Sequence, residues 1–311
     1  MKKLLPLLWL AAIATPLAAQ DSAASENAPE NSIVVTAQRS GAPMWTIDTP
    51  TGTVILVGEI RAIPETTPWQ PDRLREATAQ ADRVILGARG KISPGDVLRL
   101  IFSGSKFTKL PDKTEASDYL SPDQWARLSA LGTAHKEDYA RQSFLMTSFG
   151  MLRKELRFNR DTADDASDVV SKAADKAKVP TTRAGAFRGE DIIDNLAEAP
   201  PQAHIPCLTA AMDAVEAGPG IVEQRGADWR RFAIPAVMAN PLEQALGKCW
   251  PWADETIGTE LRTIWVDRIA EASAAKGTTL AVVPLRVLAE SGGVLDQLDA
   301  RGFDIAGPVW K

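Results

Sequence analysis

The chain has 311 residues, of which 45% are hydrophobic and 24% are charged, and its formal net charge is −5. This composition is typical of one or two folded, soluble domains. It argues against sequence-independent binding of nucleic acid, because a mildly acidic protein is repelled by the phosphate backbone.

The first 19 residues have the pattern of a secretory signal peptide. Two lysines follow the first methionine, an apolar run extends over residues 4–18, and small residues precede the expected cleavage after Ala19. The expected location is the periplasm, with secretion or peripheral attachment to the envelope as the alternative. An uncleaved anchor is disfavoured, because the run is short and Pro16 interrupts its end. No later segment is apolar enough to span a membrane.

Residues 20–43 are rich in Ala, Ser, Asn and Glu, which predicts a flexible linker. Within it, Ile33–Arg39 resembles the short extended box near the start of TonB-dependent outer-membrane receptors, which pairs as a strand with a periplasmic partner. The chain is too short to be such a receptor, so a stray or edge strand is the favoured interpretation.

The folded part is expected to begin near Met44. Trp45 and Ile47, followed by Val54–Val57, predict a hairpin that turns at Thr51-Gly52. A helix over 71–81 and a strand over 83–87 then suggest a parallel strand–helix–strand unit.

The middle of the chain is predicted to be helical. Ser121-Pro122-Asp123-Gln124 is a capping box, and Leu145, Phe149, Leu152 and Leu156 fall on one helix face. Further helices are expected over 165–177, 188–197, 203–217, 221–239 and 254–275. The aromatic residues Trp229, Phe232, Trp250, Trp252 and Trp265 are interpreted as core and not as a ligand cage.

The end of the chain returns to alternating strand and helix. We expect a buried strand over 279–283, a helix with Val294, Leu295 and Leu298 on one face, and a final strand over 303–309. The fold class is therefore α/β, with one sheet built from the N- and C-terminal segments and a helical insertion at about 94–276. The domain would span 44–311.

Cys207 and Cys249 are the two cysteines of the chain. In an oxidising compartment such a pair predicts a disulfide. The alternative is a reactive thiol or a metal-binding pair. This alternative is disfavoured, because the sequence has no third cysteine.

Several short motifs, in their order and spacing, resemble the TraB/PrgY/GumN family, which includes the Tiki-type proteases. They are Trp45-x-Ile47, the strand that ends at Gly58, Ile63-Pro64, Ala81–Leu86 and the closing run Gly293–Phe303. The resemblance implies an EreA/ChaN-like α/β core with helical insertions. It also implies a divalent metal held by two Gly-x-x-His motifs and a glutamate, where the metal activates a water molecule.

This sequence departs from that pattern at each position. Gly58-Glu59-Ile60-Arg61 has arginine for the first histidine, Gly87 stands at the glutamate position, and Arg286 stands in the second motif. Guanidinium does not ligate metals in proteins. Gly132-Thr133-Ala134-His135 spells the motif between helices and is interpreted as a chance match. We therefore expect no metal, no cofactor and no metal-dependent hydrolysis.

The preferred hypothesis is a protein that acts by binding an anionic small molecule or another envelope protein. Arg61 and Arg286, with Arg89 at the rim, would form an anion-binding cleft. The simpler interpretation is that these arginines pair with local acids such as Glu59 or Glu290. A hydrolase with Glu59 as general base is the second hypothesis, although an alternating strand end should turn Glu59 away from the cleft.

Overall fold

The computed structural model describes residues 41–91, 107–188, 195–196, 198–249 and 251–311. The expected signal peptide, the box at Ile33–Arg39 and almost all of the expected linker lie outside these residues, as does most of the helix expected over 188–197. No helix in the described part of the chain is long and apolar enough to cross a membrane. The fold is mixed α/β, as predicted.

The predicted hairpin is confirmed. Strand β1 (Met44–Asp48) pairs antiparallel with β2 (Gly52–Glu59), and Trp45 lies opposite Leu56. Trp45 and Ile47 are fully buried, because alternate residues of β1 face the core. The Thr49 hydroxyl donates to the Gly52 carbonyl at 2.9 Å and closes the turn.

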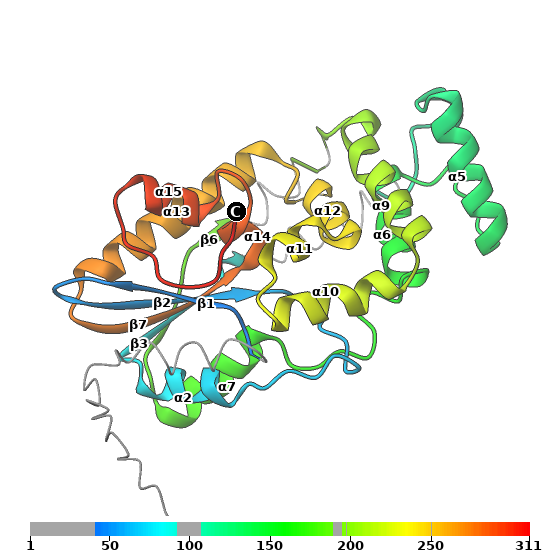
Figure 1. Ribbon diagram of the computed structural model, residues 1–311. Helices are drawn as coiled ribbons and strands as arrows, with labels where there is room; N and C mark the ends of the chain where they lie inside the picture. The colour runs from blue at the N-terminus through cyan, green and yellow to red at the C-terminus, as the bar shows by residue number, and fades with distance from the viewer. Residues whose placement is uncertain (1–40, 92–106, 189–194, 197, 250) are drawn as a thin grey trace, which may run out of the picture.

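The five-stranded sheet has the order β1-β2-β7-β3-β5 (Figure 1). Strand β7 (Gly277–Pro284) runs parallel to β2 on one side and to β3 (Arg83–Leu86) on the other. The strand–helix–strand unit is thus parallel, but β7 from the end of the chain lies between its two strands. The fifth strand, β5 (Thr181–Arg183), comes from within the span expected to be helical.

Helices cover both faces of this sheet. On one face lie α2 (Asp72–Gln80) and α7 (Ala166–Ala177), and on the other lie α13 (Glu255–Ala274) and α15 (Val294–Ala300) (Figure 1). Because both faces are covered, the central strands are continuous apolar runs. Residues 280–283 of β7 are at most 1% exposed.

A helical layer extends beyond the carboxyl ends of the strands (Figure 1). It contains α5 (Pro122–His135), α6 (Phe144–Lys154), α9 (Ile205–Ala217), α10 (Gly220–Arg230), α11 (Ile234–Ala239) and α12 (Pro241–Lys248). The predicted capping box at Ser121 and Gln124 begins α5. Phe144, Leu152 and Leu208 belong to a second hydrophobic core, separate from the core of the sheet.

Two of the predicted secondary-structure elements differ in the structure. The helix expected over 221–239 is broken into α10 and α11, because Phe232 adopts a φ of 61° that no helix can include and Pro235 then begins a new helix. The strand expected over 303–309 is reduced to a single bridge between Thr46 and Ala306, since Pro308 cannot donate to a ladder.

Trp229, Trp252 and Trp265 join a hydrophobic core as expected, but Phe232 is only partly buried and belongs to none of the cores. Trp229 and Trp265 are fully buried, but they join the core of the sheet instead of a separate helical core. Trp250 lies outside the described residues.

Candidate functional site

The ends of β2, β7 and β3 lie side by side, as the family resemblance implied. Gly58 is in register with Val283, and Glu59 with Pro284. Helix α14 (Leu285–Ala289), which the sequence did not reveal, follows β7 directly and carries Arg286. The segments that carry Arg61, Gly87 and Arg286 therefore leave one edge of the sheet, against the helical layer.

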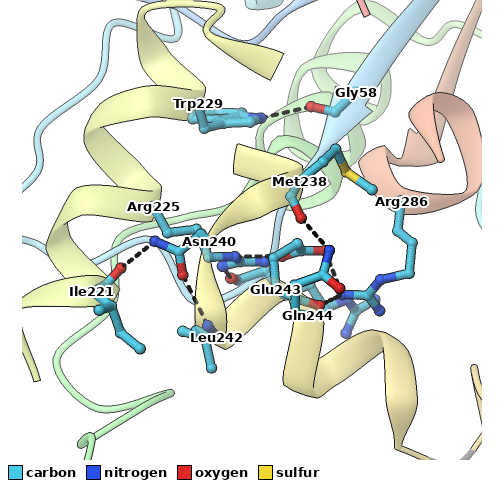
Figure 2. Close-up of polar contacts among 11 residues, drawn as sticks. Gly58, Ile221, Arg225, Trp229, Met238, Asn240, Leu242, Glu243, Gln244 and Arg286 are labelled. Atoms are coloured by element: carbon cyan, nitrogen blue, oxygen red, sulfur yellow. Dashed lines mark hydrogen bonds and ion pairs between the residues drawn. The ribbon is translucent and has the colours of Figure 1, made fainter. Parts of the chain in front are cut away.

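Gly58 is required by packing. A Cβ atom at this position would lie 2.8 Å from the Leu285 side chain and 2.9 Å from the Trp45 ring. Its carbonyl accepts a hydrogen bond of 2.8 Å from the indole nitrogen of Trp229 (Figure 2). Gly58 thus lets α10 dock against the end of β2 through a buried tryptophan.

The Glu59 side chain is buried against α7. It is 6% exposed, and its Oε1 accepts a hydrogen bond of 2.8 Å from the backbone nitrogen of Ser167 in the first turn of that helix. Burial, followed by the charge of Asp165, raises the pKa of Glu59 to about 7. The carboxyl group therefore lies beneath α7, as the expected alternation suggested.

Arg61 contributes its backbone to the structure. Its carbonyl accepts a hydrogen bond of 2.9 Å from Nη1 of Arg225, while its own side chain is exposed. The next residue, Ala62, has a φ of 58°, a conformation that costs energy for any residue other than glycine. Arg225 thus stabilises a strained turn at the end of β2.

Arg286 is held by Glu243, a residue that the sequence analysis did not single out. Nη2 of Arg286 donates both to Oε1 of Glu243 and to the Glu243 carbonyl, the latter at 2.9 Å (Figure 2). The guanidinium also lies 5.6 Å from the centre of the Trp252 ring, in cation–π contact.

The second oxygen of Glu243 binds another arginine. Its Oε2 accepts a hydrogen bond of 2.5 Å from Nε of Arg225. The Arg225 and Glu243 side chains are each 4% exposed, and that of Arg286 is 11% exposed. We call Arg225, Glu243 and Arg286 the arginine–glutamate triad.

The electrostatics of the triad keep Glu243 ionised. Burial opposes ionisation of this carboxyl, but the charges of Arg225 and Arg286 outweigh it and hold its pKa below the ordinary value. A carboxylate that accepts from two guanidiniums is fully engaged, because each of its oxygens has a charged donor.

The start of α12 positions Glu243. The Asn240 side chain caps this helix by accepting from the Leu242 nitrogen at 3.0 Å, and it donates to the Ile221 carbonyl, also at 3.0 Å (Figure 2). Asn240 followed by Pro241 is a readable helix start. That signal could have located α12 from the sequence, but it could not have shown what Glu243 binds.

Gly87 and Arg89 follow β3. A Cβ atom at Gly87 would meet no atom within 4 Å, so glycine is not required there by packing. The backbone of Arg89 belongs to a short strand, β4 (Arg89–Lys91), which pairs parallel with β6 (Ala186–Arg188).

The acids named as local partners make their hydrogen bonds and ion pairs with other groups, although the charge of Arg61 still acts on Glu59 and that of Glu290 on Arg286. Glu290 forms an ion pair with Arg262 at 2.8 Å, and Glu59 accepts from the backbone of α7. The acid that meets Arg286 comes instead from α12, which lies 43 residues earlier in the chain.

The two histidines lie in the helical layer. His135 ends α5 and contacts Glu155, with 2.5 Å between Nδ1 and Oε2. His204 precedes α9. Within the described ranges, no three His, Cys, Asp or Glu side chains gather as a metal-binding group. The groups at the strand ends, two guanidiniums and a glycine, do not suit a divalent cation.

The predicted disulfide is confirmed. Cys207 in the first turn of α9 is bonded to Cys249, which directly follows α12. The bond closes a loop over a sequence separation of 42 residues. In the chain-entropy model, a loop of this length stabilises the fold by about 4 kcal/mol.

Comparison with known proteins gives one match. The model of the TraB/PrgY/gumN family matches residues 43–306, which is most of the chain. Neither the curated proteins nor the solved structures contain a match. The matched span includes all five strands of the sheet and the arginine–glutamate triad. The chain therefore belongs to the TraB/PrgY/gumN family.

Proposed function

We propose that this chain is an exported member of its family that has an EreA/ChaN-like core, lacks metal-dependent hydrolase activity and acts by binding. The observation that carries the proposal is the arginine–glutamate triad at the end of β7, beside the end of β2. By the resemblance, we expect active members to hold their metal ligands at these strand ends.

The triad argues against catalysis on chemical grounds. A catalytic metal site commonly needs three protein ligands with free lone pairs and one open position. Arg286 and Arg225 have only donors to offer. Glu243 is a possible ligand by residue type, but both of its oxygens are taken by guanidiniums.

The triad also bears on what the protein binds. An external anion that used Arg286 would have to displace Glu243, which is already ionised and nearly fully buried. Arg61 is exposed, and its charge partly opposes the rise in the pKa of Glu59 that burial causes. This arrangement favours binding of a partner protein or ligand elsewhere on the molecule over a deep anion cleft between Arg61 and Arg286.

The test is metal analysis and peptidase assays on the mature protein purified from its native compartment. We expect no stoichiometric zinc, manganese or cobalt, and no peptide hydrolysis when these ions are added. Chelator-sensitive hydrolysis by the wild type would overturn the proposal. The matched comparison is a variant with Arg61→His, Gly87→Glu and Arg286→His, which supplies all three expected ligands.

A second candidate, a hydrolase with Glu59 as general base, is favoured by one observation. A carboxyl group with a pKa of about 7 can exchange a proton near neutral pH. However, Glu59 is buried and bonded to the start of α7. If this candidate were correct, Glu59→Gln would abolish a metal-independent hydrolase activity of the wild type.

A further inference from the structure

The helical layer contains a cavity of about 500 Å³ that shares no residue with the strand ends. Apolar side chains supply much of its wall, among them Phe107, Leu110, Phe144, Leu145 and Leu196. Cavities of this size with mostly apolar walls are typical of small-molecule binding sites. The chain thus has a candidate ligand site that the family motifs do not indicate.

Among the described residues that line this cavity, the two charged side chains balance each other. Lys109 and Asp112 both line it and both are exposed. Ser143 also lines it, but its hydroxyl is already used, because it donates to the Phe107 carbonyl at 2.5 Å and accepts from the Met146 nitrogen at 3.3 Å. With one positive and one negative side chain, the part of the rim that the structure describes carries no net charge.

Among the described residues that line the cavity, His204 is the partly buried polar side chain that is still available. It lies at the N-terminal end of α9 and is partly buried, but its side chain does not cap the helix. In the described part of the chain, its imidazole has no hydrogen-bond partner. Burial lowers the pKa of His204, which favours the neutral ring. A neutral imidazole offers one donor and one acceptor.

The disulfide supports the wall of the cavity. Leu145 packs in one buried cluster with Cys207 and Cys249, and Leu196 packs against that cluster. Cys207 lies three residues after His204, so the bond also fixes the start of α9 relative to the end of α12. A wall that is fixed before binding reduces the entropic cost of holding a ligand.

We propose that this cavity binds an uncharged, largely apolar small molecule that carries one hydrogen-bonding group, with His204 as its polar contact. The apolar wall accounts for the body of the ligand, the balanced rim for its lack of charge, and the imidazole for its single polar group. This site goes beyond the proposed function and does not depend on whether the strand ends are catalytic.

The experiment is a titration of the mature, disulfide-bonded protein with N-phenylnaphthylamine, an uncharged aromatic amine that fluoresces in apolar sites. We expect saturable binding of one probe per chain. Anilinonaphthalene sulfonate has the same ring system with a negative charge, and it should bind at least about tenfold more weakly. Tighter binding of the sulfonate would overturn the proposal that the ligand is uncharged.

Three variants test the location. Ala199→Trp places a large ring in the cavity and should weaken binding by at least about tenfold. The matched control is Ala173→Trp, which lies in a different cavity of about 510 Å³ on α7 and should bind as the wild type does. His204→Phe keeps the ring volume but removes the hydrogen bond, so it should weaken binding less than Ala199→Trp.

The disulfide is tested by Cys207→Ala combined with Cys249→Ala, which should also bind more weakly. Hydrogen exchange on the wild type locates the probe without any substitution. Protection should increase around Phe144-Leu145 and at the start of α9. Equal binding by Ala199→Trp and Ala173→Trp, protection elsewhere, or no binding by the wild type would each overturn the proposal.

Discussion

Removing the carboxylate of the arginine–glutamate triad should strongly destabilise the protein. Glu243→Ala leaves Arg225 and Arg286 as buried cations without their shared acid. Breaking a buried ion pair by removing one partner costs about 3 to 5 kcal/mol. We expect the lower end of this range, because Arg225 keeps the Arg61 carbonyl, and Arg286 keeps the carbonyl of residue 243 and the Trp252 ring.

The matched control is Glu290→Ala. It makes the same chemical change and removes an ion pair with a distance of 2.8 Å, but its partners Arg262 and Glu290 are 26% and 28% exposed. More exposed pairs contribute at most about 1 kcal/mol. The difference between the two variants therefore reports the effect of burying the charges, separately from the loss of a glutamate.

The assay is equilibrium unfolding in urea, followed by tryptophan fluorescence, with the free energy of unfolding extrapolated to water. The same variant should recover part of its stability in acetate or formate, because a small carboxylate can enter the space left by Glu243. If Glu243→Ala is no less stable than Glu290→Ala, the triad does not hold the strand ends. If sodium chloride restores stability as well as acetate does, the two guanidiniums do not select a carboxylate.

Three further predictions concern other parts of the chain. Stability should fall as pH rises from about 4.5 to about 7 and should level off above that, because the pKa of Glu59 is about 7 when folded and 4.5 when unfolded. This fall corresponds to about 3 kcal/mol, and Glu59→Gln should flatten the profile. An unchanged profile in that variant would show that Glu59 is not responsible. Arg61→His alone should not create zinc-dependent hydrolysis, since one histidine cannot replace three ligands; activity in this variant would show that the metal site is misplaced. The exported protein should begin near Gln20 by intact mass and show no free thiol, and two alkylatable cysteines under native conditions would refute an oxidised pair in the cell.

Local patterns in the sequence predicted much of the fold. The alternation of Trp45 and Ile47, the capping box at Ser121 and the apolar run of β7 each depend on residues close in the chain, so the elements could be located without knowing what they contact. The cysteine pair was predictable because only two cysteines exist. The adjacency of the strand ends came from the family resemblance together with these strands.

Only the tertiary structure showed which side chains meet at the strand ends. Arg225 and Glu243 are 18 residues apart, and Glu243 and Arg286 are 43 apart. No local pattern singles out this glutamate, and the acid that the sequence suggested for Arg286 was Glu290, four residues further along the chain. Which acid pairs with Arg286 depends on how α10 and α12 pack against the end of β7. This packing fixes the pairing of side chains across helices, and the spacing of residues in the sequence does not. The sequence therefore located the arginines, and the packing of distant helices determined that one of them is neutralised.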